Sequence, residues 1–280
     1  MLWSEKPLPV FAKPKGLQWL RVILRIIGLA IGTFLVITTY ILFIGIEKII
    51  PKIHLRPAIV SKWGMVGLRM TGLKMEVVGK HMRHGGAVVA NHASWIDIFT
   101  LHDAARVSFV AKAEVRRWPV LGWLADVTGT LFIERRASQA KNHQAALLKR
   151  LDAGDQLCFF PEGTSTDGLR VVPFRSTLFS VFHTPELIDH VWVQPATICY
   201  LPQKGLSQDF YGWWGDMALR PHAFAVLACS TKGRVRVTLH DPVKASDFAT
   251  RKDLARYCEG VVREGLAKDL AAYGVIAASS

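Results

Sequence analysis

The sequence predicts an α/β protein in which a mixed sheet is covered by helices and preceded by an N-terminal hydrophobic, membrane-anchoring helical segment. One observation behind this prediction is an apolar run of 21 uncharged residues at 26–46. At a helical rise of about 1.5 Å per residue, the run matches the thickness of a membrane's hydrocarbon core. The other observation is that short β-branched or aromatic runs alternate with helical patterns beyond residue 75. We therefore expect an anchor in residues 1–74 and one α/β domain in residues 75–280.

The composition combines strong basicity with a high apolar content, which is unusual for a soluble protein. The 280 residues carry a formal net charge of +13, and half of them are hydrophobic. A disordered chain is excluded because it would lack the apolar residues needed for a core. Residues 1–90 contain 13 Lys and Arg against 3 Asp and Glu, so most of the surplus charge surrounds the apolar run. This distribution indicates a membrane surface, where anionic lipid head groups attract Lys and Arg.

The predicted anchor consists of an apolar helix at about 26–46 and an amphipathic segment at 57–73. Basic residues lie on both flanks of the apolar helix, so the positive-inside rule does not give its orientation. Arg21 and Arg25 precede it. A signal peptide would have a shorter apolar centre and a cleavage site, and a buried core helix would be shorter. Crossing of the bilayer and bending within one leaflet both stay open, because the run contains glycines and segment 57–73 resembles an interfacial helix.

The remaining elements follow from the alternation of apolar patterns. Strands are expected at 76–78, 87–90, 107–111, 130–133, 156–160, 191–200 and 234–239. Helices are expected at 98–105, 137–153 and 251–272. The four cysteines form no CxxC pair and the histidines form no familiar ligand pattern, so neither a metal nor another cofactor is expected. A reduced domain that faces the cytoplasm is expected, while pairing of the four cysteines outside the cell stays open as an alternative.

The first candidate site follows the apolar strand at 87–90 and reads Asn91-His92-Ala93-Ser94-Trp95-Ile96-Asp97. Asp97 falls in the first turn of the next helix, from where its carboxylate can reach the Nδ1–H of His92 and stabilise the imidazolium. Nε2 would then be free to take a proton from a hydroxyl group or water. The alternative is structural: Asn91 or Ser94 caps a helix, Asp97 complements the helix dipole, and His92 has no chemical role.

The second candidate site follows the strand at 156–160 and reads FFPEGTSTDG over residues 159–168. Its glycines at 163 and 168 let the backbone approach a ligand closely. The hydroxyl groups at 164–166 can bond to phosphate or hydroxyl groups. Taken alone, this loop is only a turn.

Taken together, the NH-x4-D and FPEGT segments resemble the glycerolipid acyltransferase family, typified by 1-acyl-glycerol-3-phosphate acyltransferases. Two further blocks match in the right order: residues 112–135, which begin KAE and end ER, and the VQPA segment at 193–196. The resemblance is close over residues 75–200 and looser over the whole chain. It implies a glycerolipid acyltransferase-like fold, with residues 75–280 as the acyltransferase catalytic domain.

The resemblance also implies a reaction. A fatty acyl group would pass from an acyl-carrier-protein or coenzyme A thioester to the hydroxyl of a lysolipid. The histidine that matches His92 is the family's general base, and the aspartate that matches Asp97 orients it, so no serine or cysteine nucleophile is needed. Substrate binding is expected at Asn91, Ser94, Arg135, Glu162, Gly163, Thr164, Arg170 and Arg175.

One departure from the family pattern concerns the acceptor lipid. Many members have an arginine directly after EGT that contacts the acceptor phosphate, and here that position is Ser165. Arg170 and Arg175 are candidates to supply the missing charge, although a solvated loop face would look the same. The pattern also looks like the bacterial branch that acylates lyso-ornithine lipid. We rank lysophosphatidic acid first as the acceptor and lyso-ornithine lipid second.

Other classes of function compete with this interpretation. A serine hydrolase built from His92, Asp97 and Ser165 would lack a GxSxG elbow. A nucleic-acid-binding module would leave the apolar run unexplained, and the sequence has no recognised motif for one, so no nucleic-acid partner is expected. A catalytically inactive, membrane-bound lipid-binding protein stays open as an alternative. The expected location is the inner (cytoplasmic) membrane, in contact with anionic lipids, with the catalytic domain facing the cytoplasm.

Overall fold

The computed structural model describes residues 3, 6–49, 56–117, 121–133, 140–230 and 232–275. Every strand that the sequence predicts is present, and a short strand, β8, is added. The strands are β1 (Lys74–Gly79), β2 (Gly86–Ala90), β3 (Ser108–Lys112), β4 (Leu131–Ile133), β5 (Gln156–Phe159), β6 (Trp192–Leu201), β7 (Arg234–Leu239) and β8 (Val243–Lys244). The boundary expected between residues 74 and 75 falls at the first residue of β1.

Beyond residue 75, the helices include three that the sequence predicts and two that it misses. The three are α3 (Asp97–Ala105), α5 (Ala140–Asp152) and α7 (Arg251–Ala272), and the two are α4 (Leu121–Val127) and α6 (Leu219–Ala228). Residues 137–139 of the helix predicted at 137–153 lie outside the described residues. The N-terminal helices are α1 (Leu17–Ile49) and α2 (Arg56–Thr71), and short 3-10 helices lie at Ala113–Arg117, Ser176–His183 and Ala245–Asp247.

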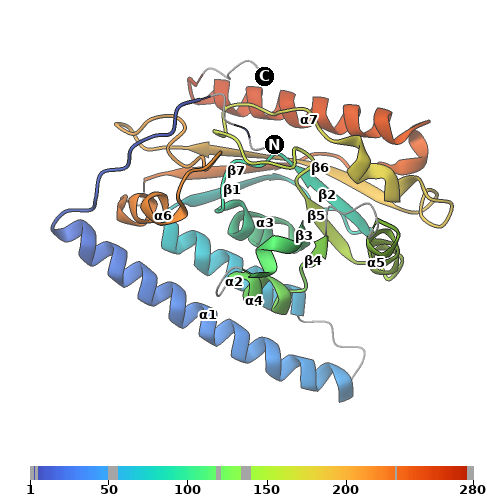
Figure 1. The fold of residues 1–280 in the computed structure, drawn as a ribbon, viewed down its shortest axis with the longest axis horizontal. Coiled ribbons are helices and arrows are strands. Elements are labelled where there is room, and N and C mark those ends of the chain that lie inside the picture. Colours follow the sequence, from blue (N-terminus) through green and yellow to red (C-terminus); the bar gives the residue numbers. More distant parts are fainter. Residues whose placement is uncertain are drawn as a thin grey trace.

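The strands form one mixed sheet, as the sequence predicts. Its order is β1-β7-β6-β2-β5-β3-β4, and β8 also pairs with β6. Strand β6 runs antiparallel to β7 and β8, whereas the remaining neighbours are parallel. Helix α7 covers one face of the sheet, while α2 and α3 cover the other and α1 lies outside α2 (Figure 1).

Alternate residues of the central strands supply the cores on the two faces. On β2, Val88 and Ala90 pack in the core shared with α2 and α3. Ala87 and Val89 pack in the core shared with α7. Both sets are fully buried because successive side chains of a strand point to opposite faces and helices cover both faces here.

Helix α1 is longer than the sequence predicts, because it begins at Leu17 and not near residue 26. Arg21 and Arg25, expected as flanking charges, lie inside the helix and bond to the C-terminal end of α6. Arg21 donates to the carbonyl of Ala228 at 2.7 Å, and Arg25 donates to that of Leu227 at 2.8 Å. These arginines satisfy carbonyl groups that a helix end leaves without partners. They therefore attach α1 to the domain.

Gly28 and Gly32 of α1 allow α2 to pack closely, and the helix continues through both positions. A side chain at Gly32 would come within 2.5 Å of Val66, and one at Gly28 within 2.7 Å of Met70. Away from these contacts, the described part of α1 exposes an apolar face of twelve large side chains: Leu17, Trp19, Leu20, Ile23, Leu24, Ile26, Ile27, Ile31, Phe34, Leu35, Ile41 and Leu42. Residues 17–44 are long and apolar enough to cross a membrane, so α1 is a candidate membrane anchor.

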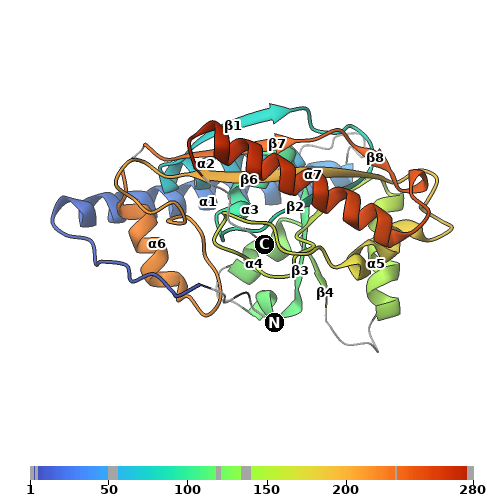
Figure 2. The ribbon, with the colours of Figure 1, turned by 90° about the horizontal axis from the view of Figure 1, so that it is seen from above.

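The segment before α1 returns along the domain past α6 toward the loops that follow the central strands (Figure 2). Phe11 contacts the ring of His222 on α6, with ring centroids 5.1 Å apart. Lys6 forms an ion pair with Asp209. Trp3 is buried against Trp214, so the described N-terminal residues pack on the same domain that α1 contacts.

Candidate active site

The fold brings the two loops singled out in the sequence together at the carboxyl ends of two neighbouring strands. Strands β2 and β5 are parallel neighbours, with Val89 opposite Phe159, so their carboxyl ends lie side by side. His92 follows β2 and Phe160 follows β5. Their rings stack with centroids 4.0 Å apart and an interplanar angle of 12°.

His92 and Asp97 form a hydrogen-bonded pair. The distance from His92 Nδ1 to Asp97 Oδ2 is 2.7 Å, and the Asp97 side chain is fully buried. Because an ionised carboxylate only accepts hydrogen bonds, Nδ1 carries the proton in this arrangement. The imidazole is 22% exposed, and no group of the described residues bonds to its Nε2. Nε2 is therefore placed to accept a proton from a bound molecule.

Main-chain groups of the same loop fix the Asp97 carboxylate. Oδ2 also accepts from the N–H groups of Ala93 at 2.8 Å and Ser94 at 3.0 Å. Asp97 is the first residue of α3, and both donors belong to the loop that precedes this helix. The short loop thus folds around the carboxylate.

Glu162 of the second loop is buried and contacts the main chain of His92. Its Oε2 accepts from the His92 N–H at 3.2 Å, while Oε1 has no partner among the described residues. Burial is the main cause that raises the pKa of Glu162 well above its usual value, against the opposing hydrogen bonds from the His92 and Val172 N–H groups. With 2% of its surface exposed, Glu162 faces the protein and not open solvent.

Thr166, which the sequence did not single out by itself, contacts the other side of the His92 main chain. Its N–H donates to the His92 carbonyl at 2.9 Å. The second loop therefore bonds both the N–H and the C=O of His92. The only signal in the sequence is the run of hydroxyl residues at 164–166, which does not specify a partner.

Asn91 and Ser94, both expected to bind substrate, are buried within the fold. The Asn91 side chain exchanges two hydrogen bonds with the main chain of Ile198, at 2.9 and 2.8 Å. This exchange connects the loop after β2 to the neighbouring strand β6. Ser94 is fully buried, and its hydroxyl has no partner among the described residues.

The arginines expected near the second loop have different surroundings. Arg170 pairs with the buried Asp167 at 3.2 Å and lies 4.9 Å from the centre of the Trp3 ring. Arg175 is exposed and packs beside Gly163, where an added Cβ would lie 3.1 Å from its Nε. Gly163 has a φ of +68°, a conformation that favours glycine. Arg135 lies outside the described residues.

Thr164 and Ser165 of the second loop are nearly buried, and Thr164 contacts the N-terminal segment. The Thr164 hydroxyl accepts from the Trp3 N–H at 3.1 Å. Ser165 is 9% exposed, and no hydrogen bond among the described residues joins its hydroxyl to His92. The serine–histidine contact that a serine hydrolase needs is therefore not formed in this part of the chain.

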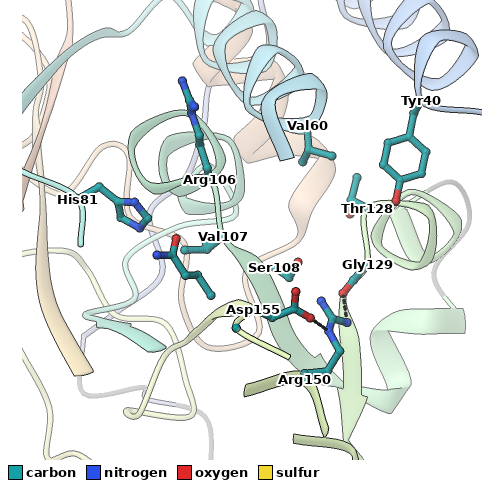
Figure 3. Close-up of a pocket in the computed structure, with 12 residues that line it drawn as sticks. Tyr40, Val60, His81, Arg106, Val107, Ser108, Thr128, Gly129, Arg150 and Asp155 are labelled. Carbon is teal, nitrogen blue, oxygen red and sulfur yellow. Dashed lines mark hydrogen bonds and ion pairs between the residues drawn. The ribbon is translucent and has the colours of Figure 1, made fainter. Parts of the chain in front are cut away.

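A pocket of about 540 Å³ lies away from these loops, at the amino ends of β3 and β5 (Figure 3). Arg150 lies in it, paired with Asp155 and donating to the Gly129 carbonyl at 3.1 Å. Neither His92 nor Asp97 lines this pocket. The His92–Asp97 pair follows the carboxyl end of β2, so it lies at the other end of the parallel strands from this pocket.

Comparison with known proteins places this chain within a known group. The family model described as Acyltransferase matches residues 74–198. A lyso-ornithine lipid O-acyltransferase of Rhodobacter capsulatus is 48% identical over 75% of this chain and 76% of its own. One from Brucella abortus is 38% identical over 70% of this chain and 76% of its own. A 1-acyl-sn-glycerol-3-phosphate acyltransferase of Neisseria gonorrhoeae is 35% identical over 48% of this chain and 53% of its own.

A solved structure shares the fold. The crystal structure of the 1-acyl-sn-glycerophosphate (LPA) acyltransferase PlsC from Thermotoga maritima matches with a TM-score of 0.58 and 22% identity. The match covers 91% of this chain and 98% of that one. The predicted arrangement, a mixed sheet covered by helices behind an apolar N-terminal helix, is confirmed.

Proposed function

Because the chain belongs to the acyltransferase family, we propose that it is a membrane-bound enzyme that moves a fatty acyl group from acyl-carrier protein or coenzyme A to the hydroxyl of a lysolipid. The observation that carries this proposal is the His92–Asp97 pair. Asp97 is buried and bonds Nδ1, while Nε2 has no partner among the described residues. This is the geometry that a general base for a hydroxyl group requires.

In the proposed reaction, His92 Nε2 takes the proton of the lysolipid hydroxyl as its oxygen attacks the thioester carbonyl carbon. Asp97 accepts the Nδ1–H bond and stabilises the imidazolium that forms. The carbon–sulfur bond then breaks, the new ester bond remains, and the proton passes from His92 to the departing thiolate. No acyl-enzyme forms, so the buried Ser165 needs no role.

We propose that the second loop positions His92 as well as lining the acceptor site. Glu162 and Thr166 bond to the N–H and C=O of His92, which supports a positioning role for both residues. Arg175 is the exposed cation beside Gly163 and is our candidate for contact with the acceptor head group. A guanidinium is well suited to a carboxylate or a phosphate.

We propose lyso-ornithine lipid as the acceptor, with lysophosphatidic acid second, which reverses the order ranked from the sequence. The relatives named for lyso-ornithine lipid match over a larger share of this chain than those named for the glycerol phosphate substrate. The charges around the loop agree. A phosphate monoester carries about −1.5 to −2 at pH 7, whereas an amino-acid head group carries a single carboxylate. Here Ser165 replaces an arginine and Asp167 neutralises Arg170.

The exposed apolar face of α1 supports the membrane location. Because its other face packs along α2 and α6, crossing the bilayer independently of the domain would break those contacts. We propose that α1 lies in the surface of the inner membrane, with anionic lipids near the basic N-terminal third. The four cysteines are free, which agrees with a domain that faces the cytoplasm.

The test is an acyl-transfer assay with the full chain on vesicles of phosphatidylethanolamine and phosphatidylglycerol. Labelled acyl-carrier protein or coenzyme A thioester is offered with lyso-ornithine lipid or lysophosphatidic acid. We expect at least tenfold higher kcat/KM for lyso-ornithine lipid, and a loss of about 10²–10⁴-fold in His92→Ala with vesicle binding retained.

Arg175→Gln should raise the KM for the lysolipid. Near-normal turnover by His92→Ala would contradict the proposed chemistry, and no turnover by the native chain would favour an inactive lipid-binding protein.

A further inference from the structure

Tyr200 lies on β6 where this strand extends beyond the end of β2. The two strands run in parallel as far as the pair Ala90 and Ala196, and β6 then continues to Leu201 alongside β7. Tyr200 points to the face covered by α3, in the core that also contains Ile198. The extra length of β6 therefore carries a phenol group to the first turn of α3.

The Tyr200 hydroxyl donates to Asp97 Oδ1 at 2.7 Å. The other three hydrogen bonds to this carboxylate, from His92 Nδ1 and the N–H groups of Ala93 and Ser94, all reach Oδ2. Among the described residues, Tyr200 is thus the donor that serves the second oxygen. Two oxygens fixed by separate partners leave the carboxylate no freedom to rotate about its terminal bond.

The direction of this hydrogen bond follows from its neighbours. Thr100 lies 3.4 Å from the Tyr200 oxygen, but its own hydroxyl donates to the Ile96 carbonyl. The phenol hydrogen is therefore available to Asp97. Burial, followed by the nearby charge of Asp97, raises the pKa of Tyr200 well above its usual value, so the group keeps its proton throughout the working pH range.

We propose that Tyr200 is a positioning residue of the reaction, acting through Asp97 to align Oδ2 with the Nδ1–H of His92. The inference rests on the proposed function of His92 as the base. Tyr200 is 4% exposed and packed in the core, so it acts on the pair from behind and does not contact a substrate. A hydrogen bond to an ionised group contributes about 1.5–3 kcal/mol, or about 10- to 100-fold in rate if it is realised in the transition state.

The test is Tyr200→Phe, which removes one oxygen from a buried ring. We expect kcat to fall about 10- to 100-fold, with the KM of both substrates changed less than twofold and the acid limb of the pH–rate profile displaced. Tyr211→Phe is the matched control, because its ring lies 5.8 Å from that of Tyr200 and its buried hydroxyl has no partner among the described residues. This control should keep activity within twofold.

A double-mutant cycle with Asp97→Asn separates positioning from a general structural effect. If Tyr200 acts through Asp97, adding Tyr200→Phe to Asp97→Asn should cost less than twofold more. Losses that multiply independently, or a Tyr200→Phe enzyme within twofold of the native rate, would overturn the proposal. The proposed function would survive either result as long as His92→Ala stays inactive, and would itself fail if His92→Ala were active.

Discussion

The two buried acids of the site, Asp97 and Glu162, differ in how many of their carboxylate oxygens accept hydrogen bonds. Asp97 accepts four hydrogen bonds spread over both of its oxygens. Glu162 accepts main-chain N–H groups at one oxygen, and its other oxygen has no partner among the described residues. Its pKa is raised well above the usual value, chiefly by burial, which favours the neutral form of the carboxyl. A neutral group that bonds to the His92 N–H acts as a support for the histidine.

We therefore predict that Glu162→Gln keeps transferase activity within about threefold, because the amide oxygen can accept the same two bonds. Glu162→Ala leaves those N–H groups without a partner, at about 1–3 kcal/mol each, and should lose activity and stability. If Glu162 instead bound the acceptor as a carboxylate, Glu162→Gln would raise the KM for the lysolipid. Steady-state kinetics of the two variants decide between these roles.

The raised pKa of Glu162 also predicts that the stability of the native protein depends on pH. Because the folded-state pKa of Glu162 lies above the unfolded value, the native state binds the proton more tightly between the two values. Native stability should therefore fall as pH rises through the interval above the usual glutamate pKa. Glu162→Gln removes this dependence. The difference in Tm between the variant and the native protein should grow in the variant's favour from pH 5 to pH 8, and a constant difference would contradict the assignment.

At the scale of elements, local pattern predicted the sheet well and the helices less completely. The β-branched and aromatic runs are strong local signals, and all of them became strands. Helix α6 was missed because its sequence, LRPHAFAVLA, contains a proline and has no polar face that would reveal a helical period. Helix α1 was predicted too short, since Arg21 and Arg25 read as the end of an apolar run.

The contacts within the site were harder to predict than the elements. His92 and Asp97 are five residues apart, so their contact is local and follows from the turn between them. Tyr200 reaches Asp97 across 103 positions of the chain, and Trp3 reaches Thr164 across 161. Such contacts depend on strand order and on where the N-terminal segment returns, which no local pattern encodes.

The exposed face of α1 makes a prediction at this scale. Ile31 and Phe34 are 55% and 69% exposed on that face, so Ile31→Lys/Phe34→Lys should weaken vesicle binding without disturbing the packed face. Burial of one such side chain contributes about 1.5–3 kcal/mol, and the double variant should lose at least 100-fold in partition coefficient. Flotation of vesicles measures this loss.

The control for this experiment is Tyr257→Lys on α7, which introduces a lysine at another exposed side chain, 41% accessible, away from α1. It should bind vesicles like the native chain. Retention of the α1 double variant on vesicles would show that the membrane contact lies elsewhere.

At the scale of the whole molecule, the candidate membrane anchor and the candidate site are connected through α6. Arg25 of α1 bonds to carbonyl groups at the C-terminal end of α6. On α6, burial lowers the pKa of His222 to about 4, so the ring is neutral and its Nδ1 can accept. It accepts a hydrogen bond from the indole N–H of Trp95 at 3.0 Å. Trp95 lies between His92 and Asp97 in the chain. The helix is thus part of the structure that supports the loop carrying His92.

This connection predicts that Arg25→Leu destabilises the domain while leaving the membrane contact intact. The substitution leaves the carbonyls of Leu227 and Cys229 without their buried donor, a cost of about 1–3 kcal/mol. For a domain of this size we expect Tm in detergent to fall by about 2–4 °C per kcal/mol.

Arg21→Leu is the matched control, since Arg21 is exposed and makes one bond to Ala228, and its effect should be smaller. Vesicle binding should stay unchanged in both variants. Equal Tm values for Arg25→Leu and the native chain would mean that the docking of α1 does not stabilise the domain, and the anchor would then be a separable attachment.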